Sequence, residues 1–213
     1  RVYGRMSRRV DGVVVYSSGF VYDQVSKIMY DLNQIPELTA QVHDLAGPAF
    51  ELSSIIGMNE KGQMTGSIRD ASNVALGIAI DTNVNGQFSD DPADWVIQLL
   101  PDFSSTNSYG RRINESGDIL GHFLRADGTI GAYVFNPWLD GTPAELPVNL
   151  GGYMYHVMND HAQVAGIDEF NRAFLYDATT DSIQFFADAN YISITGLNNS
   201  GIFAGYASIT VTA

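Results

Sequence analysis

The chain contains no cysteine and almost no lysine. Of its 213 residues, 11 are Lys or Arg, and only Lys27 and Lys61 are lysines. The absence of cysteine excludes disulfide bonds and thiolate metal sites, and it fits an exported protein that avoids thiol chemistry as well as it fits chance. The formal net charge of −13 argues against a nucleic-acid partner, because phosphate binding requires a dense Lys/Arg surface.

The sequence also lacks a long apolar run. No stretch approaches the roughly 18 apolar residues that a membrane helix requires. No signal peptide is present, so we expect any export signal to have been removed or to lie outside this sequence. The hydrophobic content of 45% nevertheless indicates a folded protein with a sizeable core.

The arginines cluster at the start of the chain. Four of them lie within the first nine residues, namely Arg1, Arg5, Arg8 and Arg9. Such a cluster could form a small docking patch for an anion. A charged edge strand that discourages pairing with another chain is the interpretation that we favour.

One nine-residue pattern, apolar-Asn-x-x-Gly-x-apolar-x-Gly, occurs four times. Its copies are residues 58–66, 113–121, 158–166 and 197–205. Asn at the turn can hydrogen-bond its own backbone, and Gly three positions later supplies a positive φ, so each copy predicts a β-hairpin. In the third copy Ala162 replaces the turn glycine, which predicts a strained turn or a change of turn type. Four copies in one chain predict a repeat protein.

A second pattern follows the hairpins, a strand that ends in an apolar or aromatic residue and then Asp or Asn. It occurs at residues 19–23, 77–81, 132–136 and 173–177, and further apolar strands follow at 27–32, 95–100, 144–148 and 182–187. Each unit thus has about four short strands separated by turn residues. This predicts an all-β fold, a small β-propeller or a propeller-like array of four-stranded units with four to five blades.

The predicted units form one domain over residues 1–213. The units are roughly 1–34, 51–101, 109–150, 153–190 and 191–213, and the core repeat is about 40 residues long. Residues 35–50 connect the first two units and contain the one plausible short helix, around 36–45. Val2-Tyr3-Gly4 aligns with the second strand of the other units, so the chain begins inside a unit.

These recurring hairpins, followed by Arg172-Ala173-Phe174-Leu175-Tyr176-Asp177, resemble the bacterial extracellular HAF-repeat family, named for a His-Ala-Phe tripeptide. Arg172 stands where that family has His, and only Ala173-Phe174 is intact. The resemblance covers nearly the whole chain through the order of its motifs. It implies an exported or cell-surface protein with propeller-like blades, and it implies no catalytic residue.

The segment Asp81–Asp94 has the residue pattern of a calcium loop. Oxygen-bearing side chains occupy its first, third and fifth positions and a glycine its sixth, and Ca²⁺ takes roughly six to eight oxygen ligands. The predicted ligands are Asp81, Asn83, Asn85, the Gln87 carbonyl, and Asp91 or Asp94. Pro92 stands where an EF-hand has its Glu, so the loop is more similar to calcium loops inserted in extracellular repeat proteins. The alternative is an acidic turn between strands; we favour structural calcium.

Other residues give weaker indications of a site. Trp138, in a turn-rich tip, could stack on a sugar ring or pack between units. Tyr153 and Tyr155 could also stack on a sugar ring or pack between units, and for these two residues packing between units is the interpretation that we favour. The histidines lack zinc-site spacing, so we expect polar rim residues, with His122 and His161 on equivalent edges as an alternative.

The sequence therefore predicts a binding or structural module without catalytic activity. A protein or glycan at the cell surface is the expected partner, and self-assembly is a further expectation. One alternative is a glycan-binding lectin that uses its rim loops. Another is a hydrolase with a carboxylate pair in a central channel, and no residue pattern in the sequence supports it.

Overall fold

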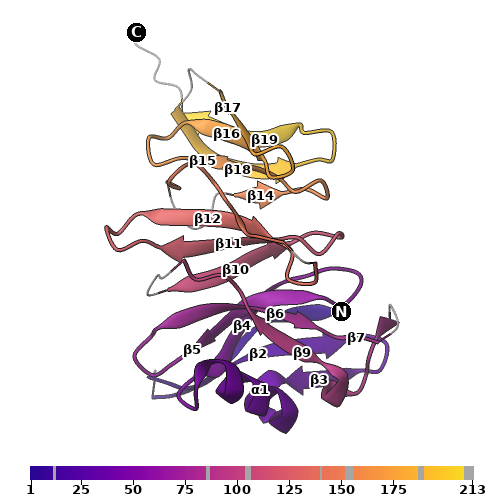
Figure 1. Ribbon diagram of the computed structural model, residues 1–213. Helices are drawn as coiled ribbons and strands as arrows, with labels where there is room; N and C mark the ends of the chain where they lie inside the picture. The colour runs from indigo at the N-terminus through magenta and orange to yellow at the C-terminus, as the bar shows by residue number, and fades with distance from the viewer. Residues whose placement is uncertain are drawn as a thin grey trace.

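The computed structural model describes residues 1–11, 13–84, 87–103, 107–139, 141–151, 156–186 and 190–208. They form small antiparallel sheets that follow one another along the chain and lie one above another in Figure 1. The all-β repeat fold is confirmed, whereas closure into a propeller remains a prediction. None of the helices in this part of the chain is long and apolar enough to cross a membrane.

The first sheet contains β1 (Val2–Val10), β2 (Val13–Asp23) and β3 (Ile28–Asp31). The second contains β4 (Glu51–Met58), β5 (Met64–Arg69), β6 (Ala75–Asp81) and β9 (Val96–Leu99). The third contains β10 (Ser108–Ile113), β11 (Ile119–Leu124), β12 (Ile130–Phe135) and β13 (Ala144–Glu145). The fourth contains β14 (Val157–Met158), β15 (Gln163–Ile167), β16 (Ala173–Asp177) and β17 (Ser182–Phe186). The fifth contains β18 (Asn190–Leu197) and β19 (Phe203–Ser208).

Short elements accompany the first two sheets. They are η1 (Leu32–Gln34), α1 (Pro36–Ala46), the two-stranded hairpin of β7 (Asn83–Val84) and β8 (Gln87–Phe88), and η2 (Pro92–Asp94). Helix α1 confirms the predicted helix, and it begins with Pro at its first turn, where the missing N–H is not needed. Its Leu38 and Val42 are buried in the core that the first two sheets share.

In β2, β6, β12 and β16 a small residue precedes a large one. The pairs are Gly19-Phe20, Gly77-Ile78, Ala132-Tyr133 and Ala173-Phe174. Successive side chains of a strand point to opposite faces, so Tyr133 and Phe174 join the core of the preceding sheet while Ala132 and Ala173 face the following one. A Cβ at Gly77 would lie 3.1 Å from backbone atoms of β10. The small residue therefore allows the next sheet to approach.

The last glycine of the repeated motif lies opposite the large residue of the third strand. Gly121 pairs with Tyr133, and a Cβ at Gly121 would lie 2.1 Å from Cζ of that ring. Gly66, Gly166 and the large residues opposite them keep the same register. In the first sheet Gly4 pairs with Phe20. Strand β1 therefore takes the place of a second strand, as the match of Val2-Tyr3-Gly4 to the second strand of the other units predicts.

The four predicted hairpin turns share one geometry. In the first, the Asn59 amide donates to the Gln63 carbonyl at 3.0 Å and the Gly62 amide donates back to the Asn59 carbonyl at 3.1 Å. The turn glycines have φ values of 88°, 95° and 76°, which confirms their predicted role. Ala162 keeps the same turn at φ 56°, with a longer turn hydrogen bond of 3.3 Å. The turn type is therefore not shifted, and the strain cost is about 1 kcal/mol.

Asparagine side chains join these turns into a ladder. In each turn the Asn Oδ1 accepts from the backbone amide four residues on. The Nδ2 of Asn59, Asn114 and Asn159 donates to the carbonyl of the corresponding Asn in the next sheet, at 3.1, 3.0 and 2.9 Å. Each of these amides also donates to a side chain within its own turn, at 2.8 Å. The three buried side chains are therefore fully hydrogen-bonded.

The residue after each Asn forms a second row of contacts between units, in which the backbone amide donates and the side chain accepts. The Glu60 amide donates to the Glu115 carboxylate at 3.1 Å, and the Glu115 amide donates to Asp160 Oδ1 at 3.1 Å. The Asp160 amide donates to Asn199 Oδ1 at 3.0 Å. An acceptor side chain at this position thus reaches back to the preceding unit. The motif specifies contacts between units as well as turns.

Candidate functional site

The Asp81–Asp94 segment leaves the second sheet and folds back beside it. Asp81 Oδ1 accepts from the backbone and side-chain nitrogens of Asn83, both at 2.9 Å. Asp91 accepts from the Ala93 amide and so caps η2, and Asp94 Oδ2 accepts from the Ser89 hydroxyl at 2.6 Å. These are the contacts of an Asx-rich turn.

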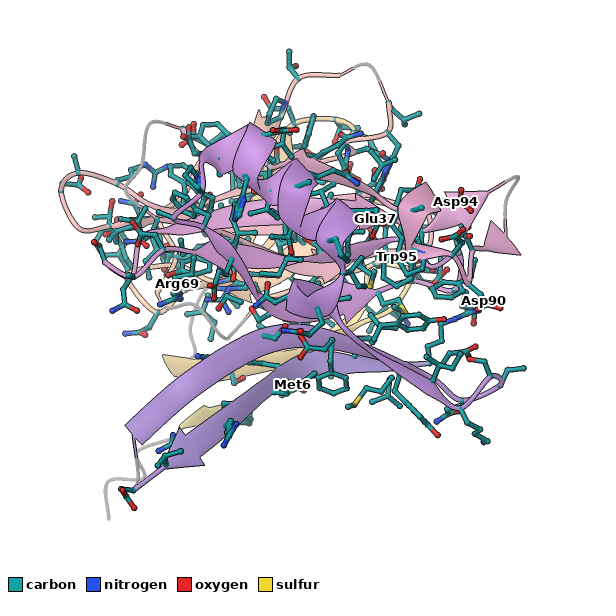
Figure 2. All side chains as sticks on the ribbon, turned by 90° about the horizontal axis from the view of Figure 1, so that it is seen from below. Met6, Glu37, Arg69, Asp90, Asp94 and Trp95 are labelled. Carbon is teal, nitrogen blue, oxygen red and sulfur yellow. The ribbon has the colours of Figure 1, made fainter. Side chains whose placement is uncertain are left out.

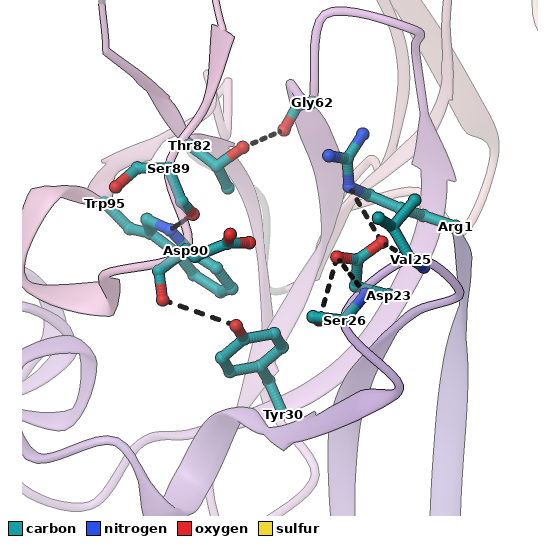
Figure 3. A network of polar contacts seen from close by, with 10 residues as sticks. All are labelled: Arg1, Asp23, Val25, Ser26, Tyr30, Gly62, Thr82, Ser89, Asp90 and Trp95. Carbon is teal, nitrogen blue, oxygen red and sulfur yellow. Dashed lines mark hydrogen bonds and ion pairs between the residues drawn. The ribbon is translucent and has the colours of Figure 1, made fainter.

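Aromatic contacts anchor this segment to the first sheet (Figure 3). The buried Trp95 donates from Nε1 to the Ser89 carbonyl at 2.9 Å, and the Tyr30 hydroxyl donates to the Asp90 carbonyl at 3.3 Å. The guanidinium of Arg1 lies 3.9 Å from the centre of the Phe88 ring. The insertion therefore attaches the start of the chain to the second sheet.

The predicted calcium ligands are only partly described. Asn85 lies outside the described residues, as does the Gln87 side chain. In the part of the chain that the structure describes, no three His, Cys, Asp or Glu side chains come together as a metal cluster. The Asn83 Oδ1 atom, however, is buried without a hydrogen-bond partner. A free oxygen at the third loop position is compatible with a bound cation, and calcium stays a prediction.

Trp138 is half-buried beside the second hairpin turn. A Cβ at Gly117 would lie 3.1 Å from Cε3 of the Trp138 ring, and the Trp138 amide donates to Asn136 Oδ1. The ring therefore packs on the turn of its own sheet. Tyr153 and Tyr155 lie outside the described residues.

Two histidines form a buried pair. The His122 and His156 rings are perpendicular, with their centres 5.3 Å apart, and both residues are almost inaccessible to solvent. Burial lowers the pKa of His156 to about 4. Burial, and secondarily the neighbouring His156, lowers the pKa of His122 well below its usual value. The predicted rim position is wrong for both residues, and the neighbour of His122 is His156 rather than His161.

The sequence interpretation missed a cavity lined by arginines and serines. It has a volume of about 270 Å³ and runs across strands of the first three sheets. Its lining residues are Arg5, Ser53, Ser54, Ile56, Ser67, Arg69, Tyr109 and Arg111. The cluster at Arg1–Arg9 is the one sequence signal for it, because Arg5 belongs to that cluster.

β-Bulges direct three side chains toward this cavity. Ser53 and Ile56 are the extra residues where the β4–β5 register shifts, and Arg111 is the extra residue where the β10–β11 register shifts. A bulge re-aims the side chain that it adds, and bulges are frequent next to functional sites. A regular hairpin pattern does not reveal where such a register shift falls.

Two of the four carboxylates that line another cavity are engaged in ion pairs. This cavity, of about 690 Å³, lies between the third and fourth sheets. Arg125 pairs with Glu145, and Arg172 pairs with Asp168 at 2.7 Å. Asn149 accepts from Arg125 and donates to Glu169 Oε1 at 3.0 Å, which is a contact that joins the two sheets here. The arrangement holds neighbouring sheets together.

The fold and its inter-unit ladder define a β-repeat protein of stacked antiparallel sheets. No protein-family model matches the chain, and no curated protein sequence matches it significantly.

Proposed function

We propose that this protein is an exported or cell-surface binding and structural module, a propeller-like array of four to five β-units without catalytic activity. One observation carries the binding role. The residues that hold the scaffold together repeat, whereas the bulge residues that line its surface differ: Ile56, Arg111 and Thr195 occupy equivalent positions in the second, third and fifth sheets. A constant scaffold with variable surface positions is the design of a binding protein.

The ionisation of the carboxyl groups supports a non-catalytic role. A hydrolase with a carboxylate pair needs one carboxyl group whose pKa is raised. Hydrogen bonds instead lower the pKa of Asp23, Asp127, Asp160 and Asp177. We expect no turnover of chromogenic glycosides or esters, and turnover that survives repurification would overturn this part of the proposal.

The proposal that the protein is exported rests on the family resemblance and on the absence of cysteine. An antibody against the protein should detect it in the culture medium or the cell envelope of its source organism. A protein confined to the cytosolic fraction would contradict the proposal.

We include structural calcium at the Asp81–Asp94 segment, with Asp81, Asn83, Asn85, the Gln87 carbonyl, and Asp91 or Asp94 as ligands. The buried, unpartnered Oδ1 of Asn83 supports this site. Bound Ca²⁺ would neutralise acidic charge and hold the insertion against the first sheet. The corresponding prediction is given in the Discussion.

A glycan-binding lectin that uses the Trp138 tip is the alternative. A glycan array with the wild-type protein and the Trp138→Ala variant tests it. Loss of hits in the variant, with an unchanged melting temperature, would favour the tip as the binding surface. Unchanged hits would exclude it.

A further inference from the structure

The cavity lined by Arg5, Arg69 and Arg111 concentrates positive charge in a strongly acidic protein. The chain has 24 acidic residues and 11 basic ones, yet three arginines and no carboxylate line this cavity. In Figure 2 Arg69 lies on the side of the molecule opposite Asp90 and Asp94, away from the acidic insertion. The field inside the cavity therefore favours an anion.

Arg5 and Arg69 keep their positive charge without a carboxylate partner in the described part of the chain. Arg5 donates from Nε to the Ser17 hydroxyl at 2.7 Å, and Arg69 contacts Asn73 Oδ1 at 3.3 Å. The Nε of Arg69 is buried without a hydrogen-bond partner. A buried guanidinium N–H without an acceptor is costly, and an oxyanion would satisfy it.

Serine hydroxyls complete the lining. Ser54 and Ser67 lie across the β4–β5 pair with their Oγ atoms 3.1 Å apart, and the Arg111 guanidinium lies 4.9 Å from the centre of the Tyr109 ring. Serine hydroxyls donate to carboxylate or sulfate oxygens without adding charge. The ring of Tyr109 supports the planar guanidinium of Arg111 in a fixed orientation.

A second cavity continues the first and has different chemistry. Its volume is about 540 Å³, and it shares Arg5, Ser53 and Arg69 with the arginine cavity. It adds the acceptors Glu51 and Asp70 to its lining. Carboxylates repel a free anion but accept hydrogen bonds from hydroxyl groups. The combined groove thus has a cationic end and a hydroxyl-accepting end.

We propose that this groove binds an acidic sugar. Its carboxylate or sulfate group lies between Arg5, Arg69 and Arg111, and its hydroxyl groups point toward Glu51 and Asp70. The larger of the two cavities has a volume of about 540 Å³. This volume suits one sugar ring, since small-ligand sites begin at roughly 300 Å³. This inference rests on the proposed role as a binding module and names its ligand class.

An NMR titration of the full chain tests the proposal with glucuronate, glucose and inorganic sulfate as probes. Glucuronate should shift the Arg69 Nε–Hε signal at millimolar concentrations and bind at least about tenfold more tightly than glucose or sulfate, because only glucuronate uses both ends of the groove. Equal affinity for sulfate and glucuronate, or no shift up to about 50 mM glucuronate, would overturn it.

Variants separate the groove from general charge effects. Arg69→Gln should weaken glucuronate binding at least about tenfold, whereas Arg8→Gln, the same charge change on exposed β1 outside the groove, should alter it less than about twofold. Melting temperatures verify that both variants fold. Equal affinities in the two variants would contradict the site.

The glycan array distinguishes this inference from the proposed function. Hits that persist in Arg69→Gln but disappear in Trp138→Ala would refute the groove and leave the binding role intact. Hits that disappear in Arg69→Gln and include acidic glycans would support both.

Discussion

The side-chain amide of Asn114 donates to the backbone carbonyl of Asn159 at 3.0 Å, across 45 residues of sequence. The same Nδ2 donates to Asp118 Oδ2 at 2.8 Å, while Oδ1 accepts from the Asp118 amide. The side chain therefore needs an amide nitrogen and a carbonyl oxygen at once. Aspartate has the same shape but no donor, so the geometry explains why the motif requires Asn.

Replacing this residue should break one step of the ladder. Asn114→Asp removes both hydrogen bonds that Nδ2 donates, to the Asn159 carbonyl and to Asp118, and places a carboxylate beside Asp118; the Asn159 carbonyl keeps its bond from the Ala162 amide. We expect a loss of roughly 2–3 kcal/mol in the free energy of unfolding, from the two lost hydrogen bonds and the like-charge contact. Denaturant unfolding followed by circular dichroism measures it.

Asn198→Asp is the matched control. Asn198 Oδ1 accepts from the amides of Ser200 and Ile202, and within the described residues its Nδ2 makes no inter-unit contact. This variant should lose less than about 1 kcal/mol. Similar losses in the two variants would show that the ladder step adds nothing beyond the turn.

The turn glycines should differ in their tolerance of alanine. At Gly201 a Cβ meets its nearest neighbour at 3.5 Å, so Gly201→Ala should cost only the left-handed strain of about 1 kcal/mol. At Gly62 the Cβ would lie 2.5 Å from Thr82 Oγ1, which donates to the Gly62 carbonyl at 2.8 Å. Gly62→Ala should therefore cost at least about 1 kcal/mol more. Thermal unfolding of both variants checks the order, which equal losses would contradict.

The buried histidine pair should make stability depend on pH. The folded-state pKa of His156 is about 4, below the ordinary value of 6.5, so the unfolded chain binds more protons between these values. The stabilisation is complete above pH 6.5 and decreases as the pH falls toward 4, by as much as about 1.4 kcal/mol per pH unit for this residue. The lowered pKa of His122 acts in the same direction.

Denaturant unfolding at a series of pH values measures this slope. His156→Phe keeps an aromatic ring and removes the titrating group, so the slope between pH 6.5 and 4.5 should be smaller in this variant. Arg8→Gln, which changes an exposed residue and keeps both histidines of the pair, should leave the slope unchanged. A wild-type protein equally stable at pH 6.5 and 4.5 would refute the burial argument.

Calcium should stabilise the protein if the proposed loop binds it. At a concentration about a hundredfold above the dissociation constant, Ca²⁺ should add roughly 2.7 kcal/mol, and the melting temperature should rise by about 5–10 °C. A chelator should reverse the shift, and Asn83→Ala should abolish it, whereas Asp44→Asn on exposed α1 should not. The absence of both heat in calorimetry and a chelator-sensitive melting temperature would remove the metal from the proposal.

The candidate site was predictable only where it depends on local chemistry. The Asp81–Asp94 insertion and the Trp138 tip are visible because turn residues stand out in a sequence. The arginine groove was not visible, since Arg69 and Arg111 lie in different repeats and a bulge directs Arg111 toward Arg5. Register shifts of one residue reverse the face of a side chain and leave no clear trace in the hydrophobic pattern.

The sequence by itself determined the repeat, the hairpins and the strand that ends in Asp or Asn, because these depend on turn conformation and on the alternation of strand faces. Only the tertiary structure decided that Asn114 reaches Asn159, that His122 meets His156, and that three arginines share one groove. Those contacts join residues tens of positions apart, and the stacking of sheets fixes them. The motif around Asn114 is thus both a turn and the connection between units.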